Sequence, residues 1–179
     1  MTARSPIART GYRRPVHFPT VTARRIAIIH LAATWFMVGM IWTIHVVHYP
    51  LFAEVGATTY EGFQAAHVDR IGRLLLVPWL TEGVTLVALV LFAASDRRRD
   101  LRRAVAIGAV AMAVVLVISG VWSAPAHGEL AGGFDAAVHE RLMTANLVRA
   151  LAWSVRGACA AWIVVVLWRR DATVSQSTR

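Results

Sequence analysis

Lysine is absent from this chain of 179 residues, and cysteine occurs only once, as Cys159. A single cysteine excludes a disulfide within the chain and a zinc site built on cysteines. Charged residues are few, at 16% against about 25% in soluble domains, while hydrophobic residues reach 57%. This composition argues against both a soluble globular protein and a disordered one. The net charge is nevertheless +9, so the sequence indicates an integral membrane protein with basic flanks.

Four apolar runs are long enough to cross a bilayer, which takes about 20 mostly apolar residues. We therefore predict an all-α fold, an integral membrane four-helix bundle over residues 26–170. The first run is too long for a signal-peptide core, so we expect it to remain as an uncleaved span. A basic tail at 1–25 precedes the bundle and a short tail at 171–179 follows it. The predicted spans are 26–49, 74–94, 104–122 and 142–168.

Arginines gather on one side of the predicted bundle. Fourteen of them lie in the two tails and in the loop between the second and third spans, whereas the other side has only Arg70, Arg73 and Arg141. By the positive-inside rule, both termini are cytoplasmic. The same rule explains the basic tail, so we expect contact with the lipid bilayer and no nucleic-acid binding.

Five of the seven histidines collect at the other, outer side. His45 and His48 end the first span, His67 lies in the first outer loop, and His127 and His139 lie in the second. Imidazole binds copper, iron and zinc, and histidines from different helices would form a metal site within a bundle. Histidine is also common at membrane interfaces, so an interfacial role for each ring is the alternative.

The fourth span carries a polar stripe, because Asn146, Arg149, Trp153 and Arg156 lie within about 80° of one another on a helix. Each charge at mid-membrane costs about 2.5–3.5 kcal/mol, so the two arginines should face the bundle interior and need partners. Glu82, in the second span, lies at a depth where it can pair with either arginine. One carboxylate does not neutralise both.

The arginine left over would receive an anionic substrate group, such as a carboxylate, an enolate or a quinone oxygen. Glu82, Asn146 and Arg149 are then the catalytic candidates, and Trp153 and Arg156 are candidates for binding a cofactor. The alternative is a structural ion pair, with the second arginine extending toward the cytoplasm.

Short motifs add a resemblance. They are His48-Tyr49-Pro50-Leu51-Phe52, His67-x-x-Arg70-Ile71, Pro125-x-His127, Asp135-x-x-x-His139-x-Arg141-Leu142 and Asn146-x-x-Arg149-x-x-x-Trp153. Over about residues 35–160 the chain resembles an uncharacterised family of small four-span bacterial membrane proteins, and its architecture is similar to that of the anthrone-oxygenase-like membrane proteins. The resemblance implies a four-span protein of the bacterial inner membrane and favours the histidines within the motifs over His45. It implies no particular reaction.

Three functions remain open. The first is a metal-dependent oxidoreductase or oxygenase for a lipophilic substrate, with copper, iron or zinc bound by His48, His67, His127 and His139. Arg149 and Asn146 would orient a substrate oxygen, and Glu82 would fix Arg149 or accept a proton. The second is a b-type haem electron carrier with two outer histidines as axial ligands. The third is a non-enzymatic small transporter or assembly partner, for which we expect a homo-oligomer.

Overall fold

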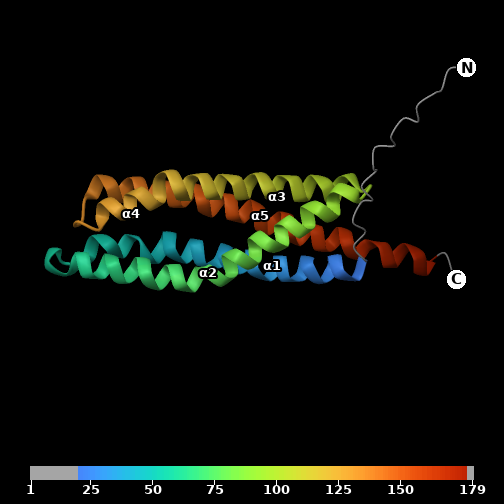
Figure 1. Cartoon of the computed structure of the whole chain (residues 1–179), viewed down its shortest axis with the longest axis horizontal. Coiled ribbons are helices and arrows are strands. Elements are labelled where there is room, and N and C mark those ends of the chain that lie inside the picture. Colours follow the sequence, from blue (N-terminus) through green and yellow to red (C-terminus); the bar gives the residue numbers. More distant parts are fainter. Residues whose placement is uncertain (1–19, 177–179) are drawn as a thin grey trace, which may run out of the picture.

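The computed structural model describes residues 20–176, and these form four long helical rods packed side by side (Figure 1). Each rod is long and apolar enough to cross a membrane, which confirms the predicted all-α bundle. The elements are α1 (Thr20–Thr43), η1 (Ile44–His48), η2 (Pro50–Glu54), α2 (Ala57–Ser95), α3 (Arg99–Ile118), η3 (Ser119–Ser123), α4 (Ala124–Leu130) and α5 (Ala136–Gln176). Of the two predicted tails, residues 1–19 and 177–179 lie outside the described residues.

The helices extend well beyond the apolar runs that predicted them. α2 has 39 residues and α5 has 41, which corresponds to roughly 60 Å each, about twice the hydrocarbon thickness. The first turns of α2 are polar, so hydropathy detects only the part that can cross lipid. Consequently His67, His127 and His139 lie on helices (α2, α4 and α5) and not in the loops where the sequence had placed them.

Aspartate side chains hold the start of α5 and the connection between α2 and α3. Asp135 precedes α5, and its Oδ1 accepts a hydrogen bond from the backbone N–H of Val138 (2.9 Å), as a helix N-cap does. Asp96 precedes α3 and accepts hydrogen bonds from both the backbone and the guanidinium of Arg98. These bonds raise the pKa of Arg98 above its ordinary value. The connection between α2 and α3 is therefore held by a charged hydrogen-bond pair.

α5 lies at the centre of the packing, since it contacts both α1 and α3 along the bundle. Gly157 allows the close approach to α1, because a Cβ atom at this position would lie 3.2 Å from Cγ2 of Val38. α2 packs mainly on α1 and crosses obliquely toward the start of α3 (Figure 1). The face of α2 that points away from α1 is consequently only partly covered by other helices.

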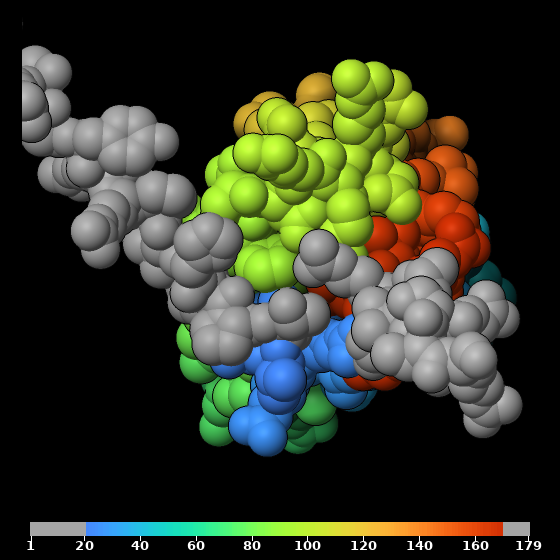
Figure 2. All heavy atoms as spheres, turned by 90° about the vertical axis from the view of Figure 1, so that its right-hand side faces the viewer, coloured from blue at the N-terminus to red at the C-terminus, as the bar shows by residue number. Residues whose placement is uncertain are grey.

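The start of α1, the connection between α2 and α3, and the last turns of α5 meet at one end of the bundle, which Figure 2 shows end-on. We call this the inner end, and the opposite end the outer end. The inner end carries the arginines Arg24, Arg25, Arg97, Arg98, Arg99, Arg102, Arg103 and Arg169. The histidine-bearing segments lie at the outer end.

Candidate functional site

Three histidines from three different elements come together at the outer end. His48 ends η1, His67 lies on α2 and His127 lies on α4. Nε2 of His48 and Nδ1 of His67 are 2.8 Å apart and share a hydrogen bond. The ring centroids of His67 and His127 are 5.3 Å apart. Three of the four histidines predicted as metal ligands are therefore neighbours.

His127 belongs to a hydrogen-bonded chain that runs inward. The side-chain amide nitrogen of Gln64 donates to Nδ1 of His127 (2.9 Å), so a neutral ring carries its proton on Nε2. That Nε2–H donates to the hydroxyl oxygen of Tyr49 (2.9 Å). Since the Tyr49 oxygen acts as the acceptor, its own proton remains available to a further acceptor.

His139, the fourth predicted ligand, has a different role. Its Nε2–H donates to the backbone carbonyl of Tyr49 (2.8 Å), and its ring packs against Phe52 and Phe134. The imidazole therefore holds the backbone of Tyr49 in place. Among the residues that the structure describes, no three His, Cys, Asp or Glu side chains surround a common point suited to a metal ion.

Two π-helical turns shape this end of the bundle. η1 ends with His48 and leads directly to Tyr49, whose N–H donates to the carbonyl of Ile44. η3 leads from α3 into α4 and His127. A π-turn inserts an extra residue into the helical repeat and is often found at functional sites. Pro50 and Pro125 follow the two turns, where each occupies the first turn of the next element.

Deeper in the bundle, Glu82 forms a buried ion pair with Arg156. Oε1 of Glu82 accepts from Nη2 (2.6 Å) and Nε (3.0 Å) of Arg156, and Oε2 accepts from Nε1 of Trp153 (3.1 Å). Nη1 of Arg156 donates to the carbonyl of Gly108 (2.9 Å). Both carboxylate oxygens are thus used. Of the two arginines that the sequence offered to Glu82, the structure pairs it with Arg156.

Arg149 is the arginine left over. Only 9% of its surface is exposed, and within the described residues no carboxylate lies within ion-pair distance of it. Its Cζ lies 5.6 Å from the ring centroid of Trp153, and its guanidinium lies beside the Tyr49 hydroxyl. Its Nε has no hydrogen-bond partner within the described part of the chain.

Asn146 lies one helical turn from Arg149 on α5, and it is fully buried. Neither its side-chain nitrogen nor its oxygen has a hydrogen-bond partner in the structure. Nε2 of His67 and Oε1 of Gln64 are likewise buried without a partner. Buried polar atoms are normally satisfied, so a group of unpartnered atoms along one end of the bundle indicates a place built for something further.

A surface cleft of about 560 Å³ between α2 and α4 reaches this chain of residues from outside. Gln64, Asp69 and His127 are among the residues that line it. His127 therefore joins the outer surface to Tyr49, and Tyr49 lies beside Arg149.

Tyr49 and Gln64 are the two site residues that sequence reasoning did not select. Tyr49 stands inside the His48-Tyr49-Pro50 motif, so its position was visible although its role was not. Gln64 precedes His67 by three residues, which places both on one face of α2. Nothing in the sequence distinguishes it from other polar residues of that helix.

Comparison with known protein families, with curated proteins and with solved structures finds no match to this chain. The site therefore has to be interpreted from its own geometry.

Proposed function

We propose that this chain is a multi-pass protein of the bacterial inner membrane, with both termini in the cytoplasm, that binds a lipophilic molecule through a negatively charged oxygen. The oxygen belongs to a carboxylate, an enolate or a quinone-type group, and Arg149 holds it. The observation that carries this proposal is a buried guanidinium with no carboxylate partner among the described residues. An isolated buried charge is costly, and a bound anion would offset that cost.

The surroundings of Arg149 favour an oxygen ligand in particular. Among the described residues, Nε of Arg149 and the amide nitrogen of Asn146 are donors without partners, and the Tyr49 hydroxyl has a proton to donate. Donors fixed in a site with little water stabilise an oxyanion far more than the same groups do in water. The hydrogen bond from His127 fixes the Tyr49 hydroxyl as one of these donors.

Charge dependence of ligand binding tests this proposal. cis-Parinaric acid, an intrinsically fluorescent fatty acid, and its neutral methyl ester are titrated into the protein held in lipid nanodiscs. We expect saturable binding of the acid, and Arg149→Met should weaken it about tenfold or more, because a charged hydrogen-bond partner is lost. The methyl ester should bind wild type and variant alike.

Arg141→Met is the matched control, because Arg141 lies on the same helix toward the outer end but is exposed and paired with Glu129. It removes the same charge and should leave the affinity for the acid unchanged. Equal affinity of Arg149→Met and wild type for the acid would overturn the proposal. Equal loss in both arginine variants would also overturn it, because it would show only a surface-charge effect.

A metal-dependent oxidoreductase or oxygenase is the second candidate, and one observation favours it. His48, His67 and His127 lie in contact, and Nε2 of His67 is buried without a partner. Imidazole nitrogens suit copper, iron and zinc, and such a metal would supply redox or Lewis-acid chemistry beside the anion site. His139 is less suited, because its Nε2 already donates to Tyr49. The close contacts among the rings favour this candidate over a haem placed between them.

Metal analysis of the purified protein tests the second candidate. Stoichiometric copper, iron or zinc in wild type that is lost in His67→Ala supports it. His45→Ala is the matched control, since His45 lies in the same π-turn as His48 but packs against Trp42. Metal content that is equal in wild type, His67→Ala and His45→Ala would argue against a histidine-bound metal. Binding of the fatty acid without any metal or turnover would favour the non-enzymatic small transporter instead.

A further inference from the structure

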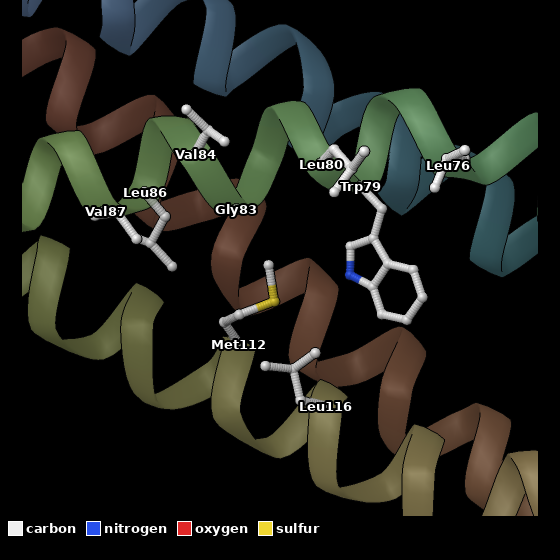
Figure 3. A pocket seen from close by; sticks show the side chains of 9 residues that line it. All are labelled: Leu76, Trp79, Leu80, Gly83, Val84, Leu86, Val87, Met112 and Leu116. Atoms are coloured by element: carbon white, nitrogen blue, oxygen red, sulfur yellow. The ribbon is translucent and has the colours of Figure 1, made fainter.

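An apolar groove lies between α2 and α3, on the side where α2 crosses away from its neighbour (Figure 3). Its volume is about 680 Å³, within the range of about 300–1,000 Å³ that is usual for sites of small ligands. Its lining residues are Leu76, Trp79, Leu80, Gly83, Val84, Leu86, Val87, Met112 and Leu116. All of them belong to membrane-spanning segments, so the groove opens toward lipid hydrocarbon.

The groove adjoins the anion site through two indole rings. Figure 3 shows Trp79 pointing from α2 into the groove. On its other side, the ring centroid of Trp79 lies 6.4 Å from that of Trp153. Trp153 in turn lies under the guanidinium of Arg149. Trp79 and Trp153 therefore form the wall between the apolar groove and the unpaired charge.

The direction of the groove matches that of an amphiphile in a bilayer. From Leu76 to Val87 it follows α2 toward the inner end for about 16 Å. Arg149 precedes Arg156 by seven residues, or about 10 Å, on α5, and Arg156 is paired with Glu82 of α2. Since α2 and α5 both run from the outer end to the inner end, Arg149 lies at the level of the outer end of the groove. A polar head would lie outward and its tail would lie inward, as in the surrounding lipid.

We infer that the groove between α2 and α3 binds the apolar tail of the same molecule whose oxygen anion is held by Arg149. This inference rests on the proposed function, and it assigns the ligand to a class, the single-chain amphiphiles with an anionic head. The charge of Arg149 selects the head, and the groove between α2 and α3 accommodates one chain.

Pro78 makes α2 locally less constrained beside the wall formed by Trp79 and Trp153. It lies inside α2 next to Trp79, and proline removes the backbone hydrogen bond to the residue four positions earlier. The Trp79 ring, which is half-buried, turns about its own side-chain torsions, and the missing backbone bond beside it lets this turn of α2 bend as well. Such a shift would join the groove to the site at Arg149 and give the ligand access from the lipid.

Gly83 offers a direct test, because a Cβ atom there would meet nothing within 4 Å. Gly83→Leu fills the groove without disturbing the core. Gly39→Leu is the matched control, since Gly39 lies exposed within a membrane-spanning helix, away from the groove, and a Cβ there also meets nothing within 4 Å. Octanoate and hexadecanoate are used to displace cis-parinaric acid from each variant in nanodiscs, and thermal unfolding verifies that each variant is folded.

We expect Gly83→Leu to weaken hexadecanoate binding roughly five- to tenfold. The loss is modest because the tail loses packing contacts in the groove, whereas in the bilayer it leaves lipid and not water. Octanoate should bind as before, and Gly39→Leu should change neither affinity. Leu116→Trp, which fills the groove from α3, should repeat the result if Gly83→Leu does not fold.

Three other results have separate meanings. Unchanged hexadecanoate affinity in both groove variants, with Arg149 dependence intact, overturns the groove assignment and leaves the proposed function standing. Loss of Arg149 dependence for both fatty acids overturns the proposed function, and the groove assignment with it. A change of oligomeric state in Gly83→Leu, without a change in fatty-acid affinity, would show that a second copy covers the groove and would also overturn the assignment.

Discussion

At the scale of single residues, two arginines on one stripe of α5 have opposite surroundings. Arg156 is fully engaged by Glu82 and by the carbonyl of Gly108. Glu82→Gln would leave the Arg156 charge buried and uncompensated, and breaking a buried pair in this way costs about 3–5 kcal/mol. We expect a large fall in the thermal unfolding temperature in detergent. An unfolding temperature equal to wild type would show that the pair contributes little to stability.

Arg149 should behave in the opposite way. Arg149 has no carboxylate partner among the described residues. The substitution Arg149→Met therefore removes a desolvated charge, while the methionine side chain keeps most of the packing volume. We expect a stability within about 1 kcal/mol of wild type, or above it. The measurement is the same thermal unfolding, without added ligand. A loss as large as that of Glu82→Gln would indicate a structural role and weaken the assignment of Arg149 as a ligand-binding residue.

The stripe itself followed from the helical repeat, but the choice of partner for Glu82 did not. Counting residues from the apparent outer end of each span places Glu82 slightly nearer to Arg149 in depth. This count assumes that all hydrophobic runs begin at the same depth in the membrane. α2 is helical from Ala57 onward, so its polar outer turns shift the level of Glu82 relative to α5. The partner depends on packing offsets that a single sequence does not contain.

At the scale of elements, the convergence of the histidines was predictable and its geometry was not. Alternation of the chain across the membrane brings His48, His67 and His127 to the same end, whatever the loops do. The π-helical turns η1 and η3 lead directly into Tyr49 and into the helix that carries His127. No residue pattern marks such turns, because they arise where helix packing requires one residue more per turn. The separate role of His139 also becomes visible only with the position of the Tyr49 carbonyl.

The contact between α1 and α5 depends on the absence of a side chain at Gly157. In Gly157→Ala the new Cβ atom would lie 3.2 Å from Val38 and 3.4 Å from Trp35, so these side chains of α1 must shift by a few tenths of an ångström. Overpacking of this kind costs about 1–3 kcal/mol. We expect a lower unfolding temperature, measured in detergent.

Gly108→Ala is the matched control for Gly157→Ala. A Cβ atom at Gly108 would lie 3.6 Å from Cβ of Cys159, an ordinary contact. Because alanine is a better helix former than glycine by about 1 kcal/mol, this variant should be as stable as wild type or more so. If both alanine variants lose the same stability, close approach at Gly157 is not the cause.

At the scale of the whole molecule, the fold was the most predictable property. In hydrocarbon every backbone hydrogen bond has to be made within the segment, so an apolar run of sufficient length becomes a helix. The same constraint does not act on the polar outer turns of α2 and α5, which is why their length was missed. Their extension places His67 and His139 on helical turns at the outer end of the bundle, and Arg149 follows His139 further along α5 toward the inner end. Polarity thus falls along the molecule from the outer cleft, through His127 and Tyr49, to the apolar groove.

This gradient runs from the outside of the cell inward only if the arginine-rich end faces the cytoplasm. Labelling of introduced cysteines tests that orientation. With the native cysteine removed by Cys159→Ala, Ser95→Cys places a thiol beside the α2–α3 connection and Gly132→Cys places one between α4 and α5. Because the basic residues cluster at the α2–α3 end, a membrane-impermeant maleimide should label Gly132→Cys in intact cells and Ser95→Cys only after the membrane is opened. The reverse pattern would place the histidines and the cleft in the cytoplasm, and any ligand would then have to reach Arg149 from that side.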